Sequence, residues 1–280
     1  MSKILRVFSS LCMIRSMYQH CAVAANFSPT LLPLLAESVR IAKTLDARLS
    51  LIHGDEADEK KAGRFQEKLE EVGWDGSTEI FWTEADTPLQ AILQASKDST
   101  ADLLIAGALN VKNKHRHFLG DISHGLLRHS PCDVMLFPRP NHPTNELKTL
   151  VIASEFETNR NIQLPKIIGF QKRFNIPNII LLGVLTPFIQ SKLRIKSRSD
   201  ALKLLKEAEA RVSTLTDAKV KIHLTESNTG FAACDFVQDL ENSFLAVRGV
   251  HTPKGLELPS HMDWLYQVLP TNTWLLSERN

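Results

Sequence analysis

Two groups of cationic side chains are the residues best suited to chemistry in this sequence. The first group lies shortly after residue 110 and consists of Lys112, Lys114, His115, Arg116 and His117. The second alternates along a later stretch and consists of Lys192, Arg194, Lys196 and Arg198. The first group could close over an anion as a flap, and the second could contact nucleic acid or an acidic partner. No aromatic side chains accompany the second group, and we favour solvated surface loops for both.

A short motif around Ser123 resembles a nucleophile elbow but does not meet its requirements. The segment 121–125 reads Asp-Ile-Ser-His-Gly, without the first glycine of Gly-x-Ser-x-Gly and without a strand leading directly into it. The phosphate loop and the dinucleotide-binding glycine motif are both missing from the sequence, which excludes phosphate-loop NTPases and dehydrogenases. His124 and His129 are badly spaced for one helical face, so we expect no metal site. We therefore name no catalytic residue.

The charge is small in total and uneven along the chain. The 280 residues carry a formal net charge of +2, which gives no support to bulk nucleic-acid binding. Residues 1–16 are basic, residues 17–145 are net acidic, and residues 146–280 are net basic. The four cysteines form no CxxC pair, so we expect reduced thiols in a cytoplasmic protein. They are Cys12, Cys21, Cys132 and Cys234.

The N-terminal residues imitate a secretory signal. A basic start precedes a short apolar run, and Ala22–Ala24 has the small-x-small character of a cleavage site. Arg15 interrupts the apolar run. Cleavage after Ala24 would destroy the first predicted strand. A second explanation is that translation begins at Met17 and that residues 1–16 are an over-extended start. No apolar run reaches the roughly 18–20 residues that a membrane helix needs.

Short apolar runs alternate with amphipathic segments, which predicts a parallel sheet covered by helices. The strands expected in the first half are Cys21–Ala25, Leu49–His53, Thr78–Trp82, Asp102–Ala106 and Val134–Phe137. The helices expected between them end at Leu45, span Glu56–Val72, start at Pro88 and span Asp121–His129. In the second half we expect strands at Leu150–Ala153, Asn178–Val184, Val220–Leu224, Phe244–Val247 and Thr273–Leu276. The expected helices there are Ile162–Phe174, Asp200–Leu215, Gly230–Leu240 and one near His261–Val268.

The two series of elements align, which indicates a duplication. In the first series Asn26 ends the first strand, and Asp121 and Pro131 bound the last helix; the corresponding residues of the second are Glu155, Ser260 and Pro270. A proline-rich segment separates the two. We predict two domains, residues 17–140 and 146–280, joined by a linker at 141–145 and preceded by an extension at 1–16.

Two segments resemble the universal stress protein family. Residues 17–28, Met-Tyr-Gln-His-Cys-Ala-Val-Ala-Ala-Asn-Phe-Ser, are similar to the family's opening strand. Residues 119–134 contain Leu-Leu-Arg-His-Ser-Pro-Cys and resemble its final helix and strand. The resemblance is good over residues 17–140 and weak over 146–280. It implies a tandem protein of α/β class, with two repeated doubly wound domains. Each would be a five-stranded, mainly parallel sheet flanked by helices, as in adenine nucleotide alpha hydrolase-like folds.

The resemblance also implies where a nucleotide would bind in the first domain. ATP-binding members carry Gly-x2-Gly-x9-Gly-(Ser/Thr) after strand four, where glycine amides and a hydroxyl at a helix N-terminus meet the phosphates. This sequence keeps the spacing but changes two positions, and Asn26 replaces an aspartate at the end of strand one. The candidate degenerate site is Asn26, His53, Gly107, Asn110, Gly120 and Asp121. Asp121 places a carboxylate where a phosphate would lie, and it could cap the helix itself.

The second domain keeps fewer of these features. Its remnant is Glu155, Gly249 and Ser260, with Pro259 in place of a glycine and a shorter loop before it. By the same resemblance, the strands Val134–Phe137 and Thr273–Leu276 would join the two domains as an intramolecular pseudo-dimer. A homodimer of the whole chain remains open.

Three hypotheses follow from these residues. The first is a non-enzymatic stress-response protein with degenerate nucleotide sites, which acts through contacts with an unknown protein partner and needs no cofactor. The second is a stress regulator that binds ATP or AMP at the first domain, with at most weak ATP hydrolysis. The third is an unrelated nucleotide-dependent enzyme on the same fold. We favour the first, and we expect neither membrane nor nucleic-acid partners.

Overall fold

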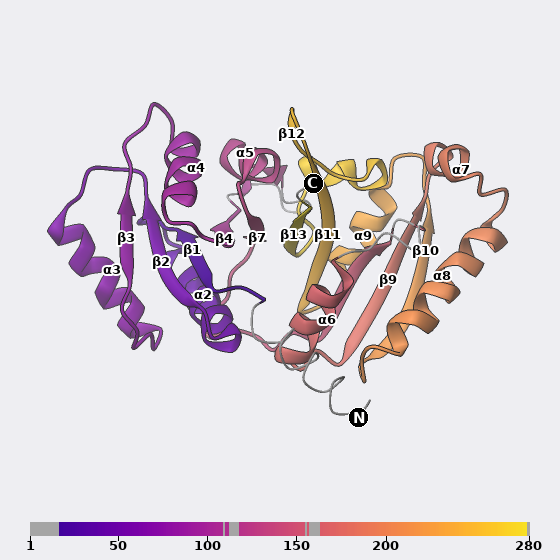
Figure 1. Cartoon of the computed structure of the whole chain (residues 1–280), viewed down its shortest axis with the longest axis horizontal. Helices are drawn as coiled ribbons and strands as arrows, with labels where there is room; N and C mark the ends of the chain where they lie inside the picture. Colours follow the sequence, from indigo (N-terminus) through magenta and orange to yellow (C-terminus); the bar gives the residue numbers. More distant parts are fainter. Residues whose placement is uncertain (1–16, 109, 112–117, 155, 157–162, 279–280) are drawn as a thin grey trace, which may run out of the picture.

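The computed structural model describes residues 17–108, 110–111, 118–154, 156 and 163–278, arranged along one long sheet (Figure 1). The first-half strands are β1 (His20–Ala24), β2 (Arg48–His53), β3 (Glu79–Trp82), β4 (Leu103–Gly107), β5 (Asn110–Val111), β6 (Phe118–Leu119) and β7 (Asp133–Phe137). The first-half helices are α2 (Leu31–Leu45), α3 (Glu59–Glu71), α4 (Pro88–Asp98) and α5 (Asp121–His129). The expectations for residues 1–16 and for the basic group at 112–117 lie outside the described residues.

The second half continues the alternation of strands and helices. Its strands are β8 (Thr149–Ser154), β9 (Asn178–Leu185), β10 (Lys219–Glu226), β11 (Ser243–Thr252), β12 (Gly255–Glu257) and β13 (Asn272–Glu278). Its helices are α6 (Leu164–Arg173), α7 (Pro187–Leu193), α8 (Arg198–Ser213), α9 (Phe231–Gln238) and the 3₁₀ helix η1 (Ser260–Tyr266).

The strand order repeats from one half to the other. The sheet runs β10-β9-β8-β11-β13-β7-β4-β1-β2-β3, with β12 beside β11. From the middle outward, the first half has the order β7-β4-β1-β2-β3 and the second half has β13-β11-β8-β9-β10. If only these five strands of each half are counted along the chain, both orders are fifth, fourth, first, second and third. Neighbouring strands on this path are parallel within each half, and β7 pairs with β13 antiparallel. The predicted α/β fold with doubly wound, mainly parallel five-stranded units is confirmed.

Alternation along the strands builds a hydrophobic layer on each face of the sheet. Val23 belongs to the layer that includes residues of α2, α3, α6 and α8, whereas Ala22 belongs to the layer that includes residues of α4, α5, α9 and η1. Both layers continue across β7 and β13, and every residue of β7 is buried. Such doubly covered parallel strands are buried on both faces, which explains their near-continuous apolar sequences.

A buried carboxylate joins the two halves at the start of β7. Asp133 is 5% exposed, and its Oδ2 accepts hydrogen bonds from the Tyr18 hydroxyl and from Lys166 Nζ, the latter at 2.7 Å. Its Oδ1 accepts from both the backbone N–H and the hydroxyl of Ser277, each at 2.8 Å. Because a buried charge is tolerated only when paired and hydrogen-bonded, these four donors make Asp133 compatible with the core.

In the second half, one predicted helix is present but differs in kind, and one predicted loop is wrong. The helix expected near His261–Val268 is the 3₁₀ helix η1, in which carbonyl groups bond to N–H groups three residues on, as from Pro259 to Met262. The basic stretch expected as a surface loop contains the end of α7 and the start of α8, and Arg198 pairs with Glu226 at 2.6 Å. Helix α7 forms because Thr186 caps its N-terminus, accepting from the Ile189 N–H, and Pro187 fits its first turn.

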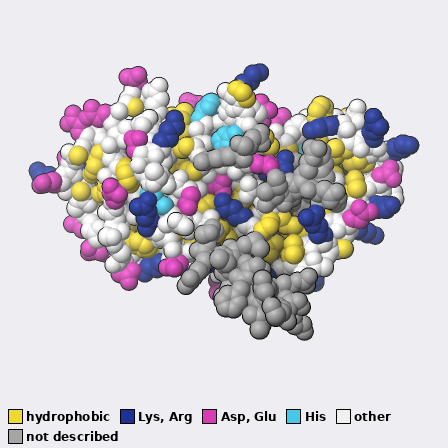
Figure 2. All heavy atoms as spheres, viewed as in Figure 1, with side chains coloured by type: hydrophobic (Ala, Val, Ile, Leu, Met, Phe, Trp, Pro, Cys, Tyr) yellow, Lys and Arg dark blue, Asp and Glu magenta, His cyan; other side chains and the backbone are white. Residues whose placement is uncertain are grey.

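None of the described helices combines the length and the apolar character that crossing a membrane requires. The side chains on the face seen in Figure 2 follow the uneven charge of the sequence, with acidic groups prominent over the first half and basic groups over the second.

Candidate functional site

A cavity of about 430 Å³ lies at the carboxyl ends of β1 and β4. The chain winds from β1 to β2 on one side and returns to β4 on the other, so these two strands form the point where the order reverses. In doubly wound sheets, ligands bind in the crevice at this point. The volume falls within the usual range of small-molecule sites, roughly 300–1,000 Å³.

Four of the six predicted first-half residues line this cavity. Asn26 follows β1, Gly107 ends β4, and Gly120 and Asp121 begin α5. Asn110 lies on β5, which pairs with β6. His53 is also outside the lining. The spacing of the sequence thus brings four of the predicted residues together at this cavity and leaves His53 outside it.

The N-terminus of α5 offers donors to this cavity. Gly120 is the N-cap residue, and no side chain caps the helix. By contrast, Asp58 caps α3 and Thr87 caps α4 through side-chain oxygens. An uncapped first turn leaves backbone N–H groups for water or an anionic ligand. The prediction that Asp121 caps the helix is wrong, because Asp121 is the first helical residue and not the N-cap.

Asp121 opposes anion binding at this end of α5. Its side chain is exposed and stands in the first turn, where a carboxylate interacts favourably with the helix dipole. An anion at about 4 Å from it would be repelled by roughly 1–4 kcal/mol, depending on how well solvent screens the pair. The helix terminus therefore already has a fixed negative charge where a phosphate would otherwise be attracted.

Gly107 leaves room that the fold does not need. A Cβ placed there would meet only Leu34 Cδ2, at an ordinary 3.7 Å, and its φ is not positive. The backbone at this position could therefore accept a side chain. Its smallness gives space inside the cavity, as the close approach of a ligand to the backbone would require.

His53 belongs to an aromatic cluster beside the cavity. Its Nδ1 lies 2.8 Å from the Ala25 carbonyl oxygen, which can only accept a hydrogen bond, so Nδ1 is the donor. The ring meets Phe27, Phe65 and Trp82 edge-on, with centroids 5.2 to 5.8 Å away. These contacts fix the position of the His53 ring at the end of β2. The three aromatic residues are distant from His53 in the sequence, so no local pattern predicts the cluster.

The equivalent crevice of the second half is filled from within. Strand β11 was expected to end before Gly249, but it continues to Thr252 and turns back through β12. A Cβ on Gly249 would lie 2.8 Å from the Leu256 side chain, so Leu256 covers the glycine. The backbone groups that follow Gly249 pair with β12 in an antiparallel hairpin between Val250 and Glu257, so they are not free to bind a phosphate. Glu155 lies outside the described residues.

His261 occupies the start of η1, next to Ser260. The side chain is 2% exposed, and neither ring nitrogen has a hydrogen-bond partner in the described part of the chain. Burial lowers the pKa of His261 to about 4, and the nearby Lys192 acts in the same direction. The backbone of Ser154 lies near the ring without meeting hydrogen-bond geometry, and it raises the pKa to a smaller extent. The sequence interpretation singled out Ser260 and missed this neighbour, because a lone histidine carries no local signal of burial.

The remaining histidine and cysteine expectations concern packing. His124 contacts the Tyr266 ring edge-on at 5.8 Å, and burial lowers the pKa of its imidazole. Within the described ranges, no group of His, Cys, Asp and Glu is arranged to hold a metal ion. Cys21, Cys132 and Cys234 are all buried.

Comparisons with known proteins find a family match for the first half and solved structures with a similar fold for the whole chain. Residues 17–138 match the universal stress protein family, and no curated protein matches the chain. A functionally unknown protein from Pseudomonas aeruginosa PAO1 has a similar structure, with a TM-score of 0.70, 16% identity and 94% of each chain covered. A universal stress protein from Archaeoglobus fulgidus has a TM-score of 0.63 at 15% identity, covering 92% of this chain and 98% of its own. At such identities the structural likeness shows the fold of the chain, and the family match is confined to the first half. Residues 17–138 of this chain therefore form a domain that matches the universal stress protein family.

Proposed function

We propose that this chain is a stress-response protein with degenerate nucleotide sites, which acts through protein contacts and catalyses no reaction. The observation that carries the proposal is the filled crevice of the second half. There Leu256 covers Gly249, and β12 takes up the backbone groups of β11. A phosphate chain that binds at Gly249 would have to displace both β12 and the buried Leu256 side chain.

The first half supports the same proposal through one charge. Its cavity is open and its α5 N-terminus is uncapped, but the exposed Asp121 carboxylate stands in the first helical turn. The repulsion of roughly 1–4 kcal/mol estimated above corresponds to a loss of between about fivefold and several hundredfold in affinity for an anion.

The chain is further proposed to be an intramolecular pseudo-dimer. The strands that would pair two separate subunits in the family, β7 and β13, pair here within one chain through Leu136, Met135 and Val134. The four hydrogen bonds to Asp133 join residues of both halves at the same place. A single chain would therefore carry the surface that a dimer presents to a protein partner.

A second candidate function is binding of ATP or AMP at the first-half cavity alone. It is favoured by the free first turn of α5 and by the room over Gly107. Isothermal titration of the full chain with ATP, ADP and AMP separates the two functions. The proposal predicts no heat of binding at millimolar nucleotide, and micromolar binding of any of the three would favour the second function instead. Phosphate release from ATP, measured on the same sample, checks the expected lack of hydrolysis.

A further inference from the structure

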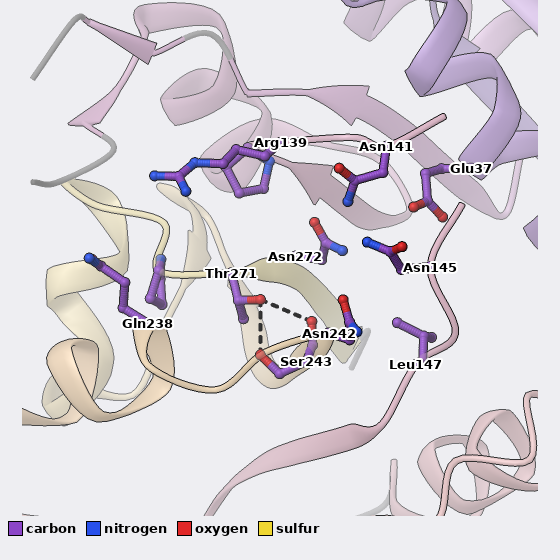
Figure 3. A pocket seen from close by; sticks show the side chains of 12 residues that line it. Glu37, Arg139, Asn141, Asn145, Leu147, Gln238, Asn242, Ser243, Thr271 and Asn272 are labelled. Carbon is purple, nitrogen blue, oxygen red and sulfur yellow. Dashed lines mark hydrogen bonds between the residues drawn. The ribbon is translucent and has the colours of Figure 1, made fainter. Parts of the chain in front are cut away.

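A second cavity lies at the junction of the two halves, next to the first. It holds about 170 Å³, opens to solvent, and is bordered by α2, the segment after β7, and the starts of β11 and β13. Figure 3 shows its lining side chains, which come from both halves and from the connecting segment between them. Pro138 lines both cavities, so the segment that follows β7 separates them. None of the expected site residues lies here.

Most side chains that line this cavity are polar, and the asparagine carboxamides among them are available to bind a ligand. Four asparagines contribute, namely Asn141, Asn145, Asn242 and Asn272. Their side-chain amides form no hydrogen bond with the described residues; the first two asparagines are exposed and the last two half-buried. The hydroxyls of Ser243 and Thr271, by contrast, are bonded to each other at 3.0 Å (Figure 3). Each carboxamide can donate and accept, so together they suit a ligand with several hydroxyl or amide groups.

The charges in the cavity favour one negative group on that ligand. Glu37 is 2% exposed, and burial raises the pKa of its carboxyl group against the opposing effect of Arg40. Arg40 donates to Glu37 Oε2 from two nitrogens, at 3.0 and 2.5 Å, which neutralises the acid. Arg139 is the other charged lining residue, and its exposed guanidinium has no ion pair in the described part of the chain. A guanidinium matches a planar carboxylate with two parallel hydrogen bonds.

Size and shape narrow the ligand further. A volume of about 170 Å³ is below that of the first cavity and well short of what a nucleotide needs. None of the described residues that line the cavity is aromatic, so they offer no platform on which a nucleobase could stack. We propose that this junction cavity binds a small monocarboxylate bearing several hydroxyl groups, with its carboxylate on Arg139 and its hydroxyls on the asparagine amides. The proposal is independent of nucleotide binding in the first cavity.

The test is a titration of the full chain with D-glycerate, L-threonate and D-gluconate. These acids share the carboxylate and lengthen in steps, and sorbitol is the neutral counterpart of gluconate. Side-chain amide signals in ¹⁵N NMR spectra report contact with Asn242 and Asn272. We expect at least one acid to shift those signals at millimolar concentration, sorbitol to shift them at least tenfold less well, and inorganic phosphate not to compete.

Two variants assign the site. Arg139→Gln removes the exposed charge and should weaken binding of the acid at least tenfold, whereas Lys206→Gln, an exposed lysine on α8, should leave it unchanged. Asn272→Leu, with its fold checked by circular dichroism, should abolish the amide shifts. Equal binding of sorbitol, equal binding to Arg139→Gln, displacement by phosphate or no shift with any acid would each overturn the proposal.

Discussion

The indole Nε1 of Trp274 donates a hydrogen bond to the Tyr18 hydroxyl at 2.8 Å, although the two residues are 256 positions apart in the sequence. Tyr18 in turn donates to Asp133, so a chain of hydrogen bonds passes from the last strand to the middle of the molecule. Tyr18 and Trp274 are both almost completely buried. The beginning and the end of the described chain are thus held together at the contact of β7 with β13.

Tyr18→Phe should weaken this contact measurably. The substitution removes a donor to Asp133 and an acceptor for Trp274 while keeping the ring, so two buried groups lose a partner. We expect the free energy of unfolding to fall by about 1–3 kcal/mol, as measured by urea denaturation. Phe188→Ala, at a side chain that is 58% exposed, is the surface control and should change it by less than about 0.5 kcal/mol. Equal effects of the two substitutions would contradict the structural role of Tyr18.

Two helical glycines provide a matched pair of substitutions. A Cβ on Gly125 of α5 would lie 2.1 Å from Leu89 Cδ2 of α4, whereas a Cβ on Gly63 of α3 would meet nothing within 4 Å. Gly63→Ala should therefore stabilise the protein by about 0.5–1 kcal/mol through helix propensity alone. Gly125→Ala should destabilise it, because overpacking costs typically about 1–3 kcal/mol.

Thermal and urea unfolding of both variants measure this difference. Adding Leu89→Ala to Gly125→Ala should remove the overpacking part of the loss, and the cycle of single and double variants isolates it. If Gly125→Ala stabilised the chain as Gly63→Ala does, the close packing of α4 against α5 would be wrong.

The buried His261 should make stability depend on pH below neutrality. Its pKa is about 4 in the folded chain, below its usual value of 6.5. Between these pH values the unfolded chain binds a proton that the folded chain does not, so stability is complete above about pH 6.5 and falls as the pH approaches 4. The loss integrates to about 3 kcal/mol. Urea denaturation between pH 7.5 and 4.5 measures it, and His261→Gln should flatten the profile relative to the parent chain. Parallel profiles for the two proteins would disprove the assignment.

The first half produced alone should associate. Residues 17–140 would end with β7 as an uncovered strand, and the side chains of Val134, Met135, Leu136 and Phe137 are fully buried in the whole chain. An exposed apolar edge strand pairs with another strand when one is available. Light scattering should therefore find a dimer or larger species of this fragment at micromolar concentration. A stable monomer would show that β7 does not need β13.

Much of the fold could be predicted because its signals are local. Helix α5 has the bounds that its sequence predicts, Asp121–His129, and the ten strands of the main path lie where the apolar runs are. Helix α7 also had a local signal, Thr186 before Pro187, which the apolar run around it concealed. The hairpin of β11 and β12 could not be predicted in this way, because β12 has three residues and depends on pairing with β11.

The site was predictable to the extent that its residues follow strands and begin helices. Asn26, Gly107, Gly120 and Asp121 meet because the carboxyl ends of parallel strands share one edge. The filling of the second crevice by Leu256 and the burial of His261 depend on tertiary packing, which leaves no periodicity in the sequence. The hydrogen bonds to Asp133 are equally nonlocal, since its partners Tyr18, Lys166 and Ser277 lie before β1, in α6 and in β13.

The most direct test of the central claim is an ATP titration of Asp121→Ser beside the parent chain. We expect no binding to the parent at millimolar ATP and measurable binding to Asp121→Ser, with an affinity at least about fivefold higher than any residual binding to the parent. Asp217→Ser removes an exposed carboxylate from the other half and should behave like the parent. Micromolar binding of ATP to the parent chain, or equal gains from both substitutions, would contradict the claim that Asp121 keeps this site from holding a nucleotide.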